Sequence, residues 1–127
     1  MSNQPKKILI VEDDQLLLKI LSNEFEKQGF KTLLAQDGEE GLDKALYEQP
    51  DLILLDIVMP KMDGLTMLKK LRAEKEGAAI PVMILTNLSG AETIEKSVAS
   101  GTFDFLVKAN WELDDIVKKV KNKLKVS

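Results

Sequence analysis

Residues 51–64 read Asp-Leu-Ile-Leu-Leu-Asp-Ile-Val-Met-Pro-Lys-Met-Asp-Gly. The run from Leu52 to Leu55 is apolar throughout and short, which favours a strand buried on both faces over a helix. A carboxylate, Asp56, follows this strand directly, and Asp63 occupies a position where a helix cap is expected. The stretch therefore predicts a buried strand that ends in a carboxylate and leads into a helix.

The rest of the chain repeats this alternation of strand and helix. Short apolar runs at 8–11, 33–35, 82–85 and 103–107 predict the other strands. Apolar residues recur at helical spacing between the strands and after the last one: Leu17, Ile20, Leu21 and Phe25; Leu65, Leu68 and Leu71; Ile94 and Val98; and Leu113, Ile116, Val117, Val120 and Leu124. This order predicts an α/β fold with a central parallel sheet and helices on both faces.

Cap residues mark the ends of the predicted helices. Asp37 and Ser89 each precede a Glu by three residues, which is the spacing of a capping box. Asn110 lies where the last helix is expected to begin, and Gly29 lies where the first helix is expected to end. Asp14 is interpreted as the cap of the first helix and not as a ligand.

The composition excludes several classes of function. The 127 residues predict a single domain over 1–127 without an output domain. The chain has no Cys and no His, which excludes disulfides, Ser-His-Asp catalysis and metal sites with thiolate or imidazole ligands. A net charge of −3 gives no electrostatic case for nucleic-acid binding. No apolar run approaches the roughly 20 residues of a membrane span, and no signal-peptide core is present, so we expect a cytoplasmic protein without membrane contact.

Polar residues follow the predicted strands at the point where each strand ends. Ligands of an open parallel sheet bind at the carboxyl ends of its strands, so these residues are expected to share one site. They are Glu12, Asp13 and Asp14 after the first strand, Asp56 after the third, Thr86 and Asn87 after the fourth, and Lys108 after the fifth.

These residue types suit phosphoryl chemistry. Carboxylates that converge on one point repel each other unless a cation lies between them, and hard oxygen ligands without His or Cys indicate Mg²⁺. A metal ion and the Lys108 ammonium neutralise charge, while the Thr86 hydroxyl donates a hydrogen bond. Asp56, at the end of a buried strand, is a candidate carboxylate nucleophile.

Four motifs in this order resemble the receiver domain of two-component response regulators, over residues from about Lys7 to Lys125. They are Ile8-Leu-Ile-Val-Glu-Asp-Asp14, the stretch 51–64, Val82-Met-Ile-Leu-Thr86 and Phe103-Asp-Phe-Leu-Val-Lys108. The resemblance, which is to a single domain of the chemotaxis-regulator type, implies a doubly wound, flavodoxin-like (βα)5 fold. Its five-stranded parallel sheet would have the order 2-1-3-4-5.

The resemblance also implies a role for each site residue. Asp56 would accept a phosphoryl group from a phosphohistidine on a sensor histidine kinase or phosphotransfer protein. Lys108 would pair with Asp56 and then with the phosphate, to which Thr86 would donate a hydrogen bond. Mg²⁺ would be coordinated by Asp13 and Asp56.

Two further ligands and a switch complete the implied site. Glu12 would act on Mg²⁺ through water, and the Val58 backbone carbonyl would coordinate it. Phe105 would turn inward when Thr86 moves toward the phosphate, and because Phe105 has no hydroxyl its switching would rest on packing alone. The face made by the fourth helix, fifth strand and fifth helix would then change shape for a downstream protein or for a homodimer.

The chain departs from the family pattern at several positions. Glu12 stands where Asp is common, and Ala109 follows Lys108 where Pro and a cis peptide are usual, which predicts a cis Lys108–Ala109 bond or a rearranged loop. Asn87 follows Thr86, where small residues are common. Val58 and Leu88, two residues beyond Asp56 and Thr86, are apolar, which predicts a long-lived phosphoryl group shielded from water.

Other readings remain open beside this one. A degenerate receiver would use the same fold as a protein-binding module without phosphorylation. This alternative stays open because Ala109 and Asn87 differ from the family pattern. A magnesium-dependent phosphatase with an Asp nucleophile would need a second Asp where Val58 stands. A nucleotide-binding protein would need a phosphate-binding glycine motif, and neither G-x-x-x-x-G-K-[ST] nor G-x-G-x-x-G occurs.

Overall fold

The computed structural model describes residues 5–56, 59, 61–86, 104–107 and 112–126, and for residues 86 and 104–107 the course of the backbone only. Five parallel strands form one sheet in the order β2-β1-β3-β4-β5, which confirms the predicted order. The strands are β1 (Lys7–Val11), β2 (Lys31–Ala35), β3 (Leu52–Asp56), β4 (Val82–Thr86) and β5 (Asp104–Val107).

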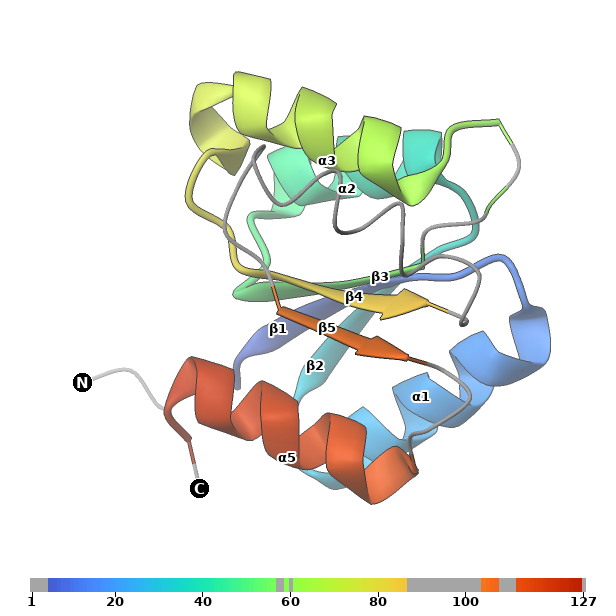
Figure 1. Ribbon diagram of the computed structural model, residues 1–127. Helices are drawn as coiled ribbons and strands as arrows, with labels where there is room; N and C mark the ends of the chain where they lie inside the picture. The colour runs from blue at the N-terminus through green and yellow to red at the C-terminus, as the bar shows by residue number, and fades with distance from the viewer. Residues whose placement is uncertain (1–4, 57–58, 60, 87–103, 108–111, 127) are drawn as a thin grey trace.

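Helices cover both faces of this sheet, as predicted. The described helices are α1 (Gln15–Lys27), α2 (Gly38–Glu48), α3 (Gly64–Ala73) and α5 (Leu113–Leu124), with a 3₁₀ turn η1 (Lys75–Gly77) after α3. Figure 1 shows α2 and α3 on one face of the sheet and α1 and α5 on the other. The helix predicted around Ile94 and Val98 lies outside the described residues.

Side-chain alternation along the strands divides the core into two layers. Successive residues of a strand point to opposite faces, and every described residue from Ile8 to Val11 and from Leu52 to Leu55 is buried. The layer under α2 and α3 contains Leu9, Val11, Ile53, Leu55, Met67, Leu68 and Leu71. The layer under α1 and α5 contains Ile8, Ile10, Leu52, Leu54, Leu21, Phe25, Ile116 and Val120. Burial of each large apolar side chain stabilises the fold by about 1.5–3 kcal/mol.

Helix α1 buries a slightly different set of residues from the one its apolar spacing suggested. Leu18, Leu21, Ser22 and Phe25 are buried, whereas Ile20 is 43% exposed. The helix ends at Lys27, and Gly29 beyond it has φ of 94°, a conformation that glycine adopts at little steric cost. The predicted end of this helix is therefore confirmed.

The predicted caps of α2 and α3 are confirmed. The Glu40 backbone N–H donates to Asp37 Oδ1 at 2.8 Å, and the Thr66 backbone N–H donates to Asp63 Oδ1 at 2.8 Å. Each bond satisfies one of the free N–H groups in the first turn of a helix. The ends of α2 and α3 that carry these caps lie at the same edge of the sheet as the carboxyl ends of the strands.

The predicted cap of α5 is wrong. The helix begins at Leu113 with Glu112 as its N-cap residue, two positions beyond Asn110. The Glu112 N–H donates to the Asp115 carboxylate at 3.3 Å, so a local acidic pair sets the start of the helix. The capping pair predicted at Ser89 lies outside the described residues.

Candidate functional site

Three carboxylates meet at the carboxyl end of the sheet. Strands β1 and β3 are neighbours with Val11 opposite Leu55, so the residues that follow them come together. Carboxylate oxygens of Glu12, Asp13 and Asp56 all lie within 4.8 Å of one another. The structure thus brings together the three acidic residues that the sequence analysis assigned to a metal site.

Two of these carboxylates are buried and one is exposed. Glu12 is 2% exposed and Asp56 is 6% exposed, whereas Asp13 is open to solvent. The backbone fixes Glu12, because its N–H donates to the Ala35 carbonyl of β2 at 3.0 Å. The Asp14 N–H in turn donates to Glu12 Oε2 at 3.1 Å, which orients the side chain. Asp56 is held by its place at the end of β3, opposite Leu85 of β4.

Asp14 does not join the cluster of carboxylates. Its Oδ1 accepts hydrogen bonds from the backbone N–H groups of Leu16 at 3.0 Å and Leu17 at 3.2 Å. These bonds cap α1, which confirms the interpretation of Asp14 as a helix cap. Adjacent aspartates of the same loop therefore have different neighbours, Asp13 in the cluster and Asp14 on the helix.

The remaining predicted site residues are placed only in part. Thr86 is the last residue of β4 and pairs with Val107 of β5, and Phe105 lies on β5 opposite Ile84. The strand ends that carry Thr86 and Asp56 are adjacent in the sheet, as predicted. Outside the described residues lie Lys108, Val58, Leu88, Asn87 and the predicted cis Lys108–Ala109 bond.

One contact made by the segment between Asp56 and α3 was not predicted. The Gly38 N–H of α2 donates to the Met62 carbonyl at 3.2 Å, and the Lys61 ammonium lies 3.6 Å from the Asp37 carboxylate. Met62 and Lys61 belong to the segment that connects Asp56 to α3. The pair Asp37-Gly38 was read as a helix start alone, and nothing in its local pattern indicates a partner more than 20 residues away in the chain.

The donor set of the cluster fits a small divalent cation. Two like charges about 4 Å apart repel by about 4 kcal/mol at an effective dielectric constant of about 20, so three adjacent carboxylates favour a bound cation. The three groups offer oxygen atoms only, and Mg²⁺ prefers oxygen ligands and keeps several of its waters. The exposed Asp13 leaves the cluster open to solvent on one side.

The profile of the response regulator receiver domain family matches residues 8–121. The chain therefore belongs to this family, whose members are signalling switches of two-component phosphorelay systems, and for which aspartyl phosphate and Mg²⁺ are typical.

None of the helices in the described part of the chain is long and apolar enough to cross a membrane.

Individual relatives agree with this assignment. The chain is 39% identical to sporulation initiation phosphotransferase F of Bacillus subtilis over 94% of each chain. It is 43% identical to the alkaline phosphatase synthesis transcriptional regulatory protein PhoP of the same species, over 64% of this chain and 33% of PhoP. A CheY-like receiver domain protein from Methanospirillum hungatei superimposes with a TM-score of 0.86 at 29% identity, over 95% of this chain and 94% of that one.

Coverage differs among these relatives. The chain spans between 23% and 47% of the length of the first three curated relatives it matches, which are transcriptional or regulatory proteins. Those relatives are much longer than the matched region. The similarity therefore concerns a receiver domain and does not extend to the other parts of those proteins.

Proposed function

We propose that this chain is a phosphorylation-dependent switch in which Asp56 accepts a phosphoryl group from a sensor histidine kinase or a phosphotransfer protein. One observation carries the proposal: Asp56 ends β3 as a buried carboxylate, and oxygens of Glu12 and Asp13 lie within 4.8 Å of its own. A similar relative of nearly the same length is named a phosphotransferase, which supports the same class of chemistry.

Mg²⁺ would be held by Asp13, Asp56, Glu12 acting through water, and the Val58 carbonyl. When bound, it would neutralise negative charge on the carboxylates and on the incoming phosphoryl oxygens. The buried Glu12 is kept in place by the Asp14 N–H, so its carboxylate faces the cluster in a fixed orientation. A preorganised set of ligands of this kind needs little rearrangement at the moment of transfer.

Transfer is a single displacement at phosphorus. An oxygen of the Asp56 carboxylate forms a bond to phosphorus while the bond between phosphorus and the donor's imidazole nitrogen breaks. The electron pair of the broken bond remains on that nitrogen, which takes up a proton. Lys108 neutralises the phosphoryl group on Asp56, and Thr86 donates a hydrogen bond to it. The protein catalyses no other turnover, apart from hydrolysis of its own aspartyl phosphate.

The signal passes from the phosphoryl group to the surface. Thr86 and Phe105 lie on the neighbouring strands β4 and β5, and by the family pattern Phe105 would turn inward when Thr86 moves toward the phosphate. The face that includes β5 and α5 then binds a downstream protein or a second copy of the chain. On α1, the helix capped by Asp14, Leu16 and Ile20 are 69% and 43% exposed and offer apolar contact area to a donor protein.

Phosphorylation by acetyl phosphate tests the proposal without a protein donor. The chain is incubated with acetyl phosphate and Mg²⁺, and its intact mass is followed with time. We expect the mass of one phosphoryl group to be added, only when Mg²⁺ is present and only while Asp56 is intact, with Asp56→Asn as the control. Absence of an adduct in a chain that still binds Mg²⁺ would contradict the proposal and favour a receiver that binds partners without phosphorylation.

A further inference from the structure

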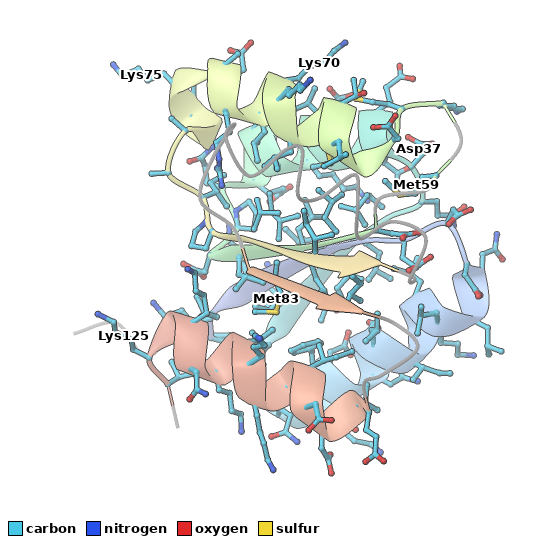
Figure 2. The ribbon with its side chains drawn as sticks, viewed as in Figure 1. Asp37, Met59, Lys70, Lys75, Met83 and Lys125 are labelled. Atoms are coloured by element: carbon cyan, nitrogen blue, oxygen red, sulfur yellow. The ribbon has the colours of Figure 1, made fainter. Side chains whose placement is uncertain are left out.

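The first turn of α2 contacts the segment that follows Asp56. The Gly38 N–H donates to the Met62 carbonyl at 3.2 Å, so the start of α2 is joined to the backbone of the segment between β3 and α3. Figure 2 shows Asp37 and Met59 toward the same end of the molecule, opposite the end that carries Lys75. We call the contact made by Asp37, Gly38, Lys61 and Met62 the α2–loop contact.

The approach at Gly38 is too close for any side chain. A Cβ built on Gly38 would lie 2.2 Å from the Met62 carbonyl oxygen and 2.9 Å from its carbonyl carbon. Both atoms belong to the backbone, so they cannot rotate away as the end of a side chain would. Since non-bonded carbon atoms pack at about 3.5–4 Å, a methyl group at this position must separate the two segments by roughly 1 Å.

A polar interaction supports the same contact. Asp37 uses one carboxylate oxygen to cap α2, and the other lies 3.6 Å from the Lys61 ammonium. Lys61 has φ of 65°, a left-handed conformation that is uncommon for a residue with a side chain. The ion pair is exposed on the Lys61 side and contributes little energy by itself. The hydrogen bond and the close approach at Gly38 therefore dominate the contact.

The segment is anchored on its inner side as well. Met59, three residues beyond Asp56, is 9% exposed and belongs to the core layer under α2 and α3, and Met62 packs against the same layer. Asp56 itself is fixed by β3. The described residues of this stretch are thus each held in place: Asp56 by the sheet, Met59 by the core and Met62 by α2.

From these contacts we infer that Gly38 is a positioning residue for the divalent-ion site: by admitting the Met62 carbonyl, it fixes the position of Met62 in the segment that links Asp56 to α3. The inference rests on the proposed function in one respect, because it takes the cluster of Glu12, Asp13 and Asp56 as the place where the cation binds. Misplacement of reacting groups by about 1 Å can cost about 100-fold in rate. The gap that a methyl group at Gly38 would open is of that size.

The test compares two glycine variants that carry the same kind of clash. A Cβ at Gly77 would lie 2.5 Å from the Leu71 carbonyl oxygen, again a backbone atom, but beyond the far end of α3. Gly38→Ala and Gly77→Ala are both expected to lower stability, which urea unfolding measures. Only Gly38→Ala is expected to weaken cation binding, by about tenfold, the lower limit seen when the support of a metal site is removed.

Free Mn²⁺ is counted by electron paramagnetic resonance in titrations of each variant, so the metal readout does not depend on phosphorylation. The rate of acetyl phosphate labelling at saturating Mg²⁺ is measured in parallel and is expected to fall in Gly38→Ala only. Unchanged Mn²⁺ affinity in a folded Gly38→Ala variant would overturn the inference. If wild type binds Mn²⁺ but gains no phosphoryl group, the proposed function fails, and the Mn²⁺ comparison still decides the inference.

A measurement on the unmodified chain covers the case in which Gly38→Ala does not fold. The amide resonance of Gly38 is followed during a Mg²⁺ titration by ¹⁵N–¹H correlation spectra. We expect it to shift with the same midpoint as the amides of Glu12 and Asp13, and its hydrogen exchange to slow when the cation binds. A Gly38 amide that neither shifts nor gains protection would overturn the inference.

Discussion

Two aspartates adjoin the same strand, and their surroundings differ. Asp51 immediately precedes β3, where its carboxylate accepts the Lys7 N–H at 2.7 Å and its own N–H donates to the Lys7 carbonyl at 2.8 Å. Asp56 ends β3 next to the carboxylates of Glu12 and Asp13. At one edge of the sheet Asp51 thus links β3 to β1 by hydrogen bonds. At the other edge Asp56 lies in a cluster of negatively charged side chains.

The difference arises from the direction of the strands. In a parallel sheet all amino ends lie at one edge and all carboxyl ends at the other, so Asp51 meets the start of β1 and Asp56 meets the residues that follow β1. Lysines lie at the edge that carries the amino ends of the strands: Lys7 and Lys31 begin β1 and β2, and the Lys7 ammonium donates to the Glu48 carbonyl. Among the described residues, the group of three carboxylates lies at the second edge.

The largest expected effect comes from the same substitution at both ends of β3. Asp56→Asn is expected to abolish labelling by acetyl phosphate, because the amide cannot serve as the nucleophile. Asp51→Asn keeps an oxygen that accepts the Lys7 N–H, so labelling should persist while stability falls by about 1 kcal/mol or less. Intact mass and urea unfolding measure the two quantities. Equal labelling of Asp56→Asn and Asp51→Asn would contradict the different roles assigned to the two aspartates.

Removal of the exposed carboxylate tests the second edge alone. Asp13→Asn replaces one of the three carboxylates with a neutral amide and leaves the two buried carboxylates in place, so Mn²⁺ affinity should fall by at least about tenfold. Because the Asp13 side chain is exposed, little change in unfolding free energy is expected. Electron paramagnetic resonance titration measures the affinity. An unchanged affinity would show that Asp13 is not a ligand.

A smaller effect is expected on the lifetime of the phosphoryl group. Val58 and Leu88 are apolar, and the family pattern predicts that they flank Asp56, at positions where polar residues would orient an attacking water. Replacement of both, Val58→Asn with Leu88→Glu, should shorten the lifetime of aspartyl phosphate, as measured by loss of the added mass after removal of acetyl phosphate. Val58→Ala with Leu88→Ala is the control for lost bulk. The same decay rate in wild type and in the polar variant would contradict the shielding hypothesis.

The sequence predicted the parts of this structure that depend on local pattern. Short apolar runs identified the strands. The preference for Asp at the N-cap position identified Asp14, Asp37 and Asp63 as helix caps. The cluster of Glu12, Asp13 and Asp56 was predictable because parallel strands bring their carboxyl ends to one edge.

The errors share a physical cause. The cap of α5 was placed at Asn110 on residue preference alone, whereas the pair Glu112 and Asp115 sets the start of the helix. The Gly38–Met62 contact depends on how α2 packs against a distant segment, and no local spacing reports that distance. Sequence periodicity thus predicts which residues are near an edge and not how closely two backbones approach there.

The smallest expected effect separates Asp14 from its neighbour Asp13. Asp14 caps α1 through two backbone N–H groups, and loss of such a cap costs about 1 kcal/mol. Asp14→Ala should therefore lower the free energy of unfolding by about this amount, whereas Asp14→Asn, which retains a capping oxygen, should leave it nearly unchanged. Mn²⁺ affinity should change little in either variant, since the backbone N–H that orients Glu12 is retained. A loss of affinity in Asp14→Asn as large as in Asp13→Asn would place Asp14 in the cation site and end the distinction between the two aspartates.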